Sequence, residues 1–401
     1  MPTGRAVAGP DGVLPDPETV ARVAWLERFY DLVIVACVGR FANKLGAAPD
    51  LSHALAVLVW PIGLWGAWLL VTLRLNRFPD EGWLTRGIVF AQLLATTVAA
   101  AATLSVTLAD NRAGAVATAA LGLCISALYL TIPRRGVVHR GLVAVPVVGS
   151  AAVAAAVLLS LILPRAAAAA LGSVVGLAFF AAVFGWFLPR LARQRPVDPR
   201  RAGDRYCQLF LILMGLSFLK VAFATSARNG VEYLVVAGAF AAGIALWAIY
   251  VDGVLPLGFP APPGRQRTWI AAQLVLAVGI AVAAAAVTAL PPSTTGKVTV
   301  AGAVLEGGSF AAVMAGFAVL AVTAQHPQPR LAYARCGAGL AMAAVTVVAA
   351  VAGGLNDRTF SGVLAAIVIA AAIVDGLLRA RLLDDEVPEP RASQQAHTRD
   401  G

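Results

Sequence analysis

Residues 268–290 read TWIAAQLVLAVGIAVAAAAVTAL, an apolar run without one charged side chain. An α-helix of this length extends about 34 Å, and the hydrocarbon core of a bilayer is about 30 Å thick. In lipid, a lone segment must satisfy its own backbone groups, which only a helix does. Barrel strands are shorter and alternate polar with apolar residues. The run therefore predicts a transmembrane helix.

Eleven further runs along the chain have the same apolar character. With the first, they cover residues 24–44, 52–73, 87–108, 113–132, 138–163, 166–188, 205–227, 231–254, 268–290, 298–322, 331–354 and 360–382. These runs predict an all-α fold, a polytopic transmembrane bundle of about twelve spans.

The composition excludes an ordinary soluble protein. The 401 residues are 59% hydrophobic and only 13% charged, with a mean hydropathy of +0.80, whereas soluble domains are about one quarter charged. The net charge of +10 comes mostly from arginines between the spans, as the positive-inside rule describes. We therefore expect the lipid bilayer as partner and no nucleic acid.

The loops that follow the even-numbered spans are the basic ones. Together with the adjoining ends of the runs, they contain Arg74, Arg77, Arg86, Arg134, Arg135, Arg140, Arg190, Arg193, Arg195, Arg200, Arg201, Arg205, Arg265, Arg267, Arg330, Arg335, Arg379 and Arg381. The opposite loops hold only scattered charges. This bias predicts that both termini are cytoplasmic.

The densest basic segment, 190–204, divides the chain into two halves. We expect a cytoplasmic tail at 1–23, a six-helix repeat at 24–189, a cytoplasmic linker at 190–204, a second six-helix repeat at 205–382 and a disordered tail at 383–401. With six spans in each, the halves would run in the same direction.

Similar motifs open the two halves. Residues 27–32 read ERFYDL and residues 204–209 read DRYCQL, each an acid followed by arginine and an aromatic residue. Trp68 and Trp247 stand late in the second span of each half. The match favours an internal repeat, and it makes Arg205 and Gln208 candidates for any polar pathway in the second half.

The first span contains the densest group of charges within an apolar run. Glu27, Arg28 and Asp31 lie within two helical turns, and Arg40 and Asn43 follow. Charges within the membrane are costly and are usually kept for a reason. Two interpretations stay open: an interfacial network of ion pairs, or a proton or cation site facing a cavity.

Glu306 is a single acid inside the run 298–322. By helical rise it lies roughly 12 Å from the outer end of that run. In apolar surroundings a carboxyl group favours its protonated form, which suits a proton-coupled site, although a neutral hydrogen bond between helices is equally allowed.

Other features have simpler interpretations. Asp375 and Asp252 fit packing or capping roles, and Gly172 with Gly176 predicts close helix packing. The four cysteines and four histidines show no ligand spacing, so we expect no disulfide framework, no metal and no cofactor.

The motifs of both halves resemble those of the bacterial low-temperature-requirement A (LtrA) family. The matching positions are Glu27, Phe29, Asp31, Trp68, Asn76, Arg77, Phe78, Arg86, Arg205, Trp247 and Asp252. One departure is Leu216, where the family usually has glutamate. The resemblance implies a multi-pass plasma-membrane protein connected with growth in the cold, and it implies no mechanism.

Two functions follow as hypotheses. The first is a transporter or ion pathway between the halves, for a small solute, proton or cation, using Glu27, Asp31 and Glu306. The alternative is a non-transporting component for cold adaptation: a sensor, a scaffold or a lipid-modifying enzyme with polar groups at Asn76, Asp80 and Glu81. The sequence leaves open whether the protein is an enzyme.

Overall fold

The fold is a bundle of long helices. The computed structural model describes residues 17–47, 51–78, 82–102, 112–132, 140–226, 233–289, 297–352 and 355–386. The helices are α1 (Pro17–Ala47), α2 (Leu51–Arg77), α3 (Trp83–Ala102), α4 (Arg112–Leu130), α5 (Arg140–Leu159), α6 (Arg165–Ala182), η2 (Val183–Phe187), α7 (Leu188–Gln194), α8 (Pro199–Ser226), α9 (Tyr233–Val251), η3 (Leu255–Leu257), α10 (Pro263–Ala289), α11 (Val300–Thr323), α12 (Pro329–Ala352) and α13 (Asp357–Glu386).

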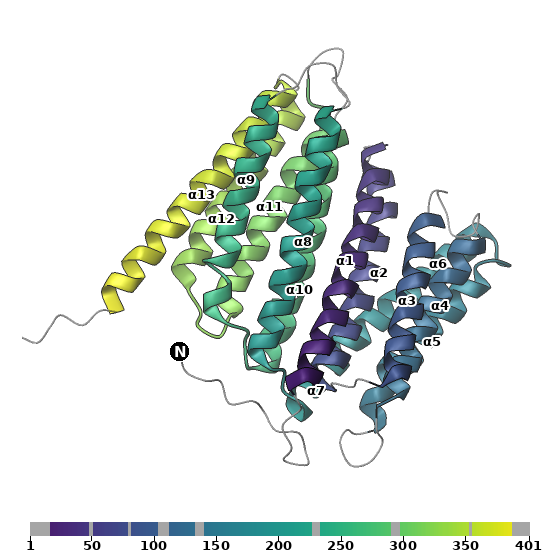
Figure 1. Ribbon diagram of the computed structural model, residues 1–401. Helices are drawn as coiled ribbons and strands as arrows, with labels where there is room; N and C mark the ends of the chain where they lie inside the picture. Colours follow the sequence, from purple (N-terminus) through teal and green to yellow (C-terminus); the bar gives the residue numbers. More distant parts are fainter. Residues whose placement is uncertain are drawn as a thin grey trace, which may run out of the picture.

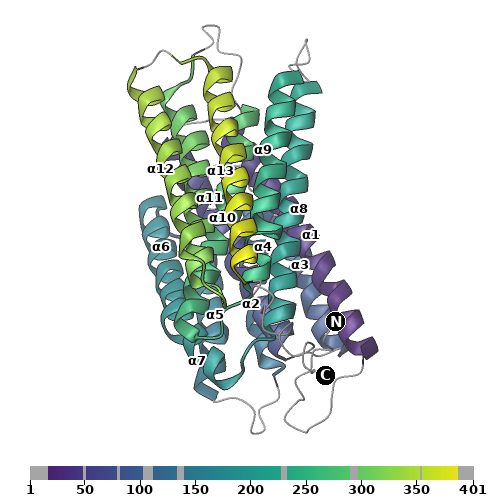
Figure 2. The same ribbon diagram turned by 90° about the vertical axis from the view of Figure 1, so that its left-hand side faces the viewer.

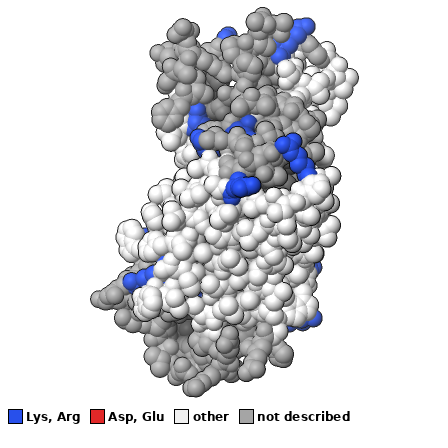
Figure 3. All heavy atoms as spheres, turned by 90° about the vertical axis from the view of Figure 1, so that its right-hand side faces the viewer, with Lys and Arg blue, Asp and Glu red and all other residues white. Residues whose placement is uncertain are grey.

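The predicted all-α bundle is confirmed. Counting α6, η2 and α7 as one continuous segment, the described residues form twelve long helices, one for each predicted span. Eleven of them are long and apolar enough to cross a membrane. The twelfth, α1, contains Glu27, Arg28, Asp31 and Arg40. Figure 3 shows one face of the molecule, where a band of uncharged side chains lies between basic margins.

Several helices extend beyond the apolar runs that predicted them. Helix α1 begins at Pro17, α8 begins at Pro199 inside the predicted linker, and α13 continues to Glu386. A helix is held by backbone hydrogen bonds, so it continues into polar sequence where hydropathy falls. The remainder of the predicted tails, 1–16 and 387–401, lies outside the described residues.

Helices α1 and α2 occupy the middle of the bundle. Figure 1 shows α8–α13 on one side of them and α3–α6 on the other, and in Figure 2 the long helices run side by side. Helix α1 contacts α2 and α3 of its own half and also α8 and α10 of the other. We call the end of the bundle where α1 begins and α7 lies the α7 end.

Aromatic rings fill the contact between the halves near the α7 end. The Tyr206 ring of α8 packs edge-on against Trp68 of α2, with centroids 5.2 Å apart, and against Trp269 of α10 at 4.8 Å. Edge-to-face ring pairs stabilise beyond their buried area. This packing fixes α8 against α2, which positions the charged groups described below.

The two entry motifs do not occupy matching faces of their helices. Glu27 is buried and its counterpart Asp204 is exposed, whereas Arg28 is exposed and its counterpart Arg205 is buried. Residues 27–32 and 204–209 therefore match in sequence, but matching positions differ in burial. The twofold repeat itself stays a prediction.

Among the described residues, no other helix packs closely against the GxxxG pair of α6. A Cβ atom added at Gly172 or Gly176 would meet nothing within 4 Å. By contrast, a Cβ at Gly122 of α4 would lie 2.7 Å from the backbone oxygen of Ser150 in α5. The close packing expected for the α6 glycines is found instead at Gly122.

Replacing Gly122 with alanine should destabilise the protein. The Ser150 carbonyl is backbone and cannot move aside without shifting α5, so Gly122→Ala should cost about 1–3 kcal/mol. Gly176→Ala is the matched control and should change stability by less than about 1 kcal/mol. Thermal unfolding in detergent measures both. Equal thermal unfolding midpoints for the two variants would show that α4 and α5 do not pack closely at Gly122.

Candidate functional site

Two acids of α1 form ion pairs with two arginines of α8. Asp31 Oδ1 lies 2.9 Å from Arg205 Nη2, and Glu27 Oε2 lies 3.1 Å from Arg201 Nη2 and 3.9 Å from Arg205 Nη1. Glu27 and Asp31 stand four residues apart, as do Arg201 and Arg205, so each pair shares one helix face. The four charges therefore join the first and second halves of the chain.

Helix α2 completes this network. The Trp68 indole N–H donates to Asp31 Oδ1 at 2.6 Å, and Arg205 Nη2 donates to Thr72 Oγ1 at 3.1 Å. The Arg205 guanidinium also lies over the Trp68 ring, 5.8 Å from its centroid. We call Glu27, Asp31, Trp68, Thr72, Arg201 and Arg205 the α1–α8 network. Asp31 is fully buried within it.

Three predicted pathway residues lie outside the α1–α8 network: Arg28, Gln208 and Glu306, which is on α11. Arg28 is exposed, with its guanidinium 5.1 Å from the centroid of the Trp25 ring. Gln208 is half-buried on α8. Of the six predicted pathway candidates, the structure brings together Glu27, Asp31 and Arg205.

A second buried ion-pair network lies wholly within the second half. Arg335 of α12 donates from Nε and Nη2 to the two carboxylate oxygens of Asp375 in α13, at 2.8 and 3.1 Å. It also donates to the backbone oxygens of Phe317 and Gly253. Arg379 lies 3.2 Å from the same carboxylate. The arginine thus joins α11, α12, α13 and the end of α9.

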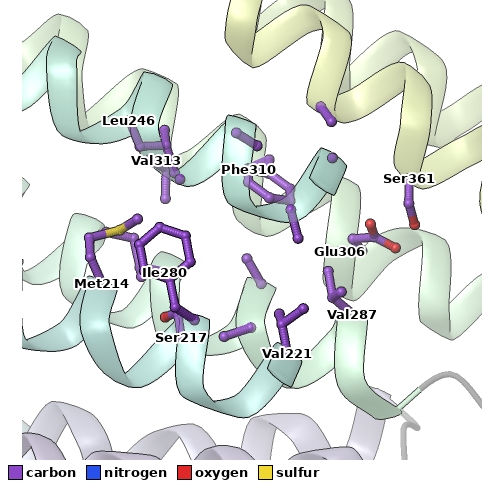
Figure 4. Close-up of a pocket in the computed structure, with 18 of the residues that line it drawn as sticks. Met214, Ser217, Val221, Leu246, Ile280, Val287, Glu306, Phe310, Val313 and Ser361 are labelled. Atoms are coloured by element: carbon purple, nitrogen blue, oxygen red, sulfur yellow. The ribbon is translucent and has the colours of Figure 1, made fainter. Parts of the chain in front are cut away.

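Glu306 lines a cavity of about 280 Å³ in the second half. Its side chain is 1% exposed. The walls come from α8, α9, α10, α11 and α13. In Figure 4, Glu306 and Ser361 lie at one side of the cavity, and Met214 and Ile280 lie at the other. Apart from Glu306, Ser217, Ser361 and Arg358, the lining side chains are apolar or glycine. A cavity of this kind holds a small ligand by shape and by a few polar contacts.

The structure places Asp31 and Glu306 in separate surroundings. Asp31 does not line the Glu306 cavity, whose walls come from the second half alone. A small cavity of about 20 Å³ does lie between the halves, and its lining includes Ile34, Trp68 and Leu213 but no charged residue. Neither of these two cavities, as the described residues form them, is lined by both acids.

Comparison with known families decides what kind of protein this is. Residues 22–374 match the family described as "Bacterial low temperature requirement A protein (LtrA)". The chain belongs to the LtrA family. The match begins in α1 and ends in α13, so it covers both halves. No curated protein matches the sequence. Family membership and the apolar helices together make this a multi-pass membrane protein.

The LtrA motif positions divide between buried and exposed sites. Trp68 belongs to the α1–α8 network, and Arg77 is buried at the end of α2. Asn76, Phe78 and Arg86 are half-buried near the same end. Phe29, Trp247 and Asp252 are exposed. Asp80 and Glu81, which the enzyme hypothesis used, lie outside the described residues.

Sequence reasoning missed Arg201 and Thr72 as partners in this LtrA protein. Arg201 was assigned to a linker, although its place four residues before Arg205 puts both on one face if the helix begins early. Thr72 carries no signal in the sequence, because its role depends on how α2 packs against α8. Arg335 was counted among the basic residues that follow the tenth span, and its pairing with Asp375, 40 residues later in the sequence, was not predicted.

Neutralising Asp31 should strongly destabilise this LtrA protein. Asp31→Asn leaves the buried Arg205 without its closest carboxylate, and breaking a buried ion pair costs about 3–5 kcal/mol. Arg28→Gln, three residues earlier on the exposed face, should change stability by less than about 0.5 kcal/mol. Thermal unfolding in detergent compares the two variants. A similar loss in both would show that burial in the α1–α8 network does not decide the effect.

Proposed function

We propose that this LtrA protein is a transporter or ion pathway of the plasma membrane, in which Glu306 binds a proton or small cation. The route runs through the cavity of the second half. In this proposal the α1–α8 network does not line the route. It holds the two halves together at the α7 end.

The observation that carries the proposal is a buried carboxyl group on a cavity lined by five helices. Acids inside membrane proteins commonly mark ion or proton pathways. Glu306 stands six residues after the start of α11, about 9 Å along the helix. Arg358, at the start of α13, lines the same cavity. Both placements put the cavity toward the end of the bundle opposite the α7 end.

The distribution of arginine supports an orientation for this route. Arg190, Arg193 and Arg195 lie in or directly after α7, and Arg200 and Arg201 lie in the first turn of α8. By the positive-inside rule the α7 end faces the cytoplasm, and both termini lie there too. The cavity then lies toward the outer side of the membrane.

Both ion-pair networks lie toward the proposed cytoplasmic end. The α1–α8 network closes the contact between α1, α2 and α8, and Arg335 joins the inner ends of α9, α11, α12 and α13. Alternating access needs such a closed side while the binding site faces the other side. The position of the two networks therefore supports the proposal of a transporter whose inner side is closed.

Neutralising Glu306 should abolish ion movement. Proteoliposomes containing the pH dye pyranine report proton flux under an imposed potential, and Na⁺ and K⁺ dyes report those cations. Wild-type protein should conduct at least one of the three ions. Glu306→Gln should lower that flux at least about tenfold, because it removes the ionisable group, and Glu306→Asp should retain part of it.

Ser309→Ala is the matched control for this assay. Ser309 is buried one turn later on α11 and donates to the backbone oxygen of Glu306 at 2.7 Å, but it does not line the cavity. Its variant should keep wild-type flux. Equal flux in Glu306→Gln and wild type, or wild-type flux no greater than in protein-free vesicles, would refute the proposal.

One observation favours the alternative, a non-transporting membrane component for cold adaptation. Most of the cavity lining is apolar, so the cavity also suits a lipid acyl chain. In that case wild-type protein would move no ion, and phospholipid would stay bound through purification. Because Ala283 lines the cavity, Ala283→Leu or Ala283→Phe would then reduce the amount of bound lipid.

A further inference from the structure

Arg77 is a buried arginine with no described acceptor. It is the last residue of α2, and its side chain is 7% exposed. The guanidinium Nε and Nη1 atoms are buried without a hydrogen-bond partner. Within the described residues, no ion pair to Arg77 is found. A buried guanidinium without a counter-charge is unfavourable, because it has lost its water and gained nothing in return.

The other deeply buried arginines of the described bundle differ from Arg77 in this respect. Arg205 pairs with Asp31, and Arg335 pairs with Asp375. Arg74, one turn before Arg77, donates to the Leu128 backbone oxygen and the Thr131 hydroxyl. Within the part of the chain that the structure describes, these three buried arginines therefore have acceptors, and Nε and Nη1 of Arg77 have none.

The surroundings of Arg77 are polar and basic. Tyr129 of α4 and Tyr206 of α8 are near enough to interact electrostatically with its guanidinium. Both polar side-chain atoms of the neighbouring Asn76 are buried without partners. The guanidinium groups of Arg74 and Arg195 each lie 5.8 Å from the Phe78 ring centroid. Arg74, Asn76 and Arg77 of α2, with Arg195, thus all lie at this end of α2.

We propose that Arg77 is the buried anchor of a binding site for a phosphate-bearing anion at the α7 end, between α2, α4 and α8. The guanidinium donates paired hydrogen bonds that match phosphate geometry. Arg77 also ends the apolar span Leu58–Arg77, so it lies at the depth of lipid headgroups. Basic pockets between membrane helices bind anionic headgroups there. Asn76 supplies a further donor and acceptor.

Two sources share this chemistry, an anionic phospholipid and free phosphate. Full-length protein, stripped of lipid in a neutral detergent, is heated alone, with phosphatidylglycerol, with phosphatidylcholine or with inorganic phosphate. A ligand that binds only the folded protein raises the unfolding midpoint. Phosphatidylglycerol should raise it by at least about 3 °C, and phosphatidylcholine should not. A shift with inorganic phosphate alone would identify free phosphate as the ligand, and the Arg77 site would stand.

Variants of Arg77 show whether the shift comes from this site. Arg77→Gln should abolish the shift, and without any anion its midpoint should equal or exceed that of wild type, because an uncompensated charge has been removed. Arg193→Gln is the matched control, an exposed arginine at the same end, and it should keep the full shift. If Arg77→Gln does not accumulate, Arg77→Lys replaces it and should lose at least half of the shift.

Four results of the ligand experiments would contradict the proposed site. They are an equal shift with phosphatidylcholine, no shift with either anion, an equal loss of the shift in Arg193→Gln, and a full shift in the Arg77 variant. A fall in the anion-free midpoint of Arg77→Gln would also contradict it, since the guanidinium would then be stabilised by the protein alone.

Discussion

The salt bridge between Asp31 and Arg205 is the contact on which the arrangement of the two halves depends. Neither charge could remain buried alone, because each would have given up its water without compensation. Their pairing requires α1 to pack against α8 with one particular axial position and one particular rotation about its helix axis. Trp68 and Thr72 of α2 then contact the same two side chains. A single buried pair thus fixes three helices from opposite halves.

The same constraint explains where polar function can lie. The contact between the halves is closed by this salt bridge and by the rings of Trp68, Tyr206 and Trp269. The cavity with Glu306 lies instead among helices of the second half. A route between the halves would have to break the network, whereas a route through the second half leaves it in place. For this reason the proposed route runs through the second half and not between the halves.

The fold was largely predictable from the sequence, because long apolar runs have few alternatives in lipid. Each of the twelve runs overlaps one long helix of the described residues. Helix ends were less predictable. Residues 199–204 were assigned to a linker because they are charged, yet they form the first turns of α8. Hydropathy reports which residues meet lipid, and it does not report where backbone hydrogen bonding stops.

The candidate site was predictable only in part. Glu27, Asp31 and Glu306 attracted attention because acids in apolar runs are costly, and all three are buried. Their partners could not be inferred, since Arg201 and Arg335 lie far from Glu27 and Asp375 in sequence. The cavity depends on five helices packing with a gap between them, which no local pattern encodes. The entry motifs were misleading about which residues of each helix are buried, because they align the buried Glu27 with the exposed Asp204.

A double-mutant cycle on Asp31 and Arg205 tests the central claim most directly. The free energy of unfolding is measured in mixed micelles for wild type, Asp31→Asn, Arg205→Gln and the double variant. If the two side chains stabilise the bundle through each other, the double variant should be at least about 2 kcal/mol more stable than the sum of the single losses predicts. Losses that add to within about 0.5 kcal/mol would show that the two charges act independently, and the account of how the halves are joined would be wrong.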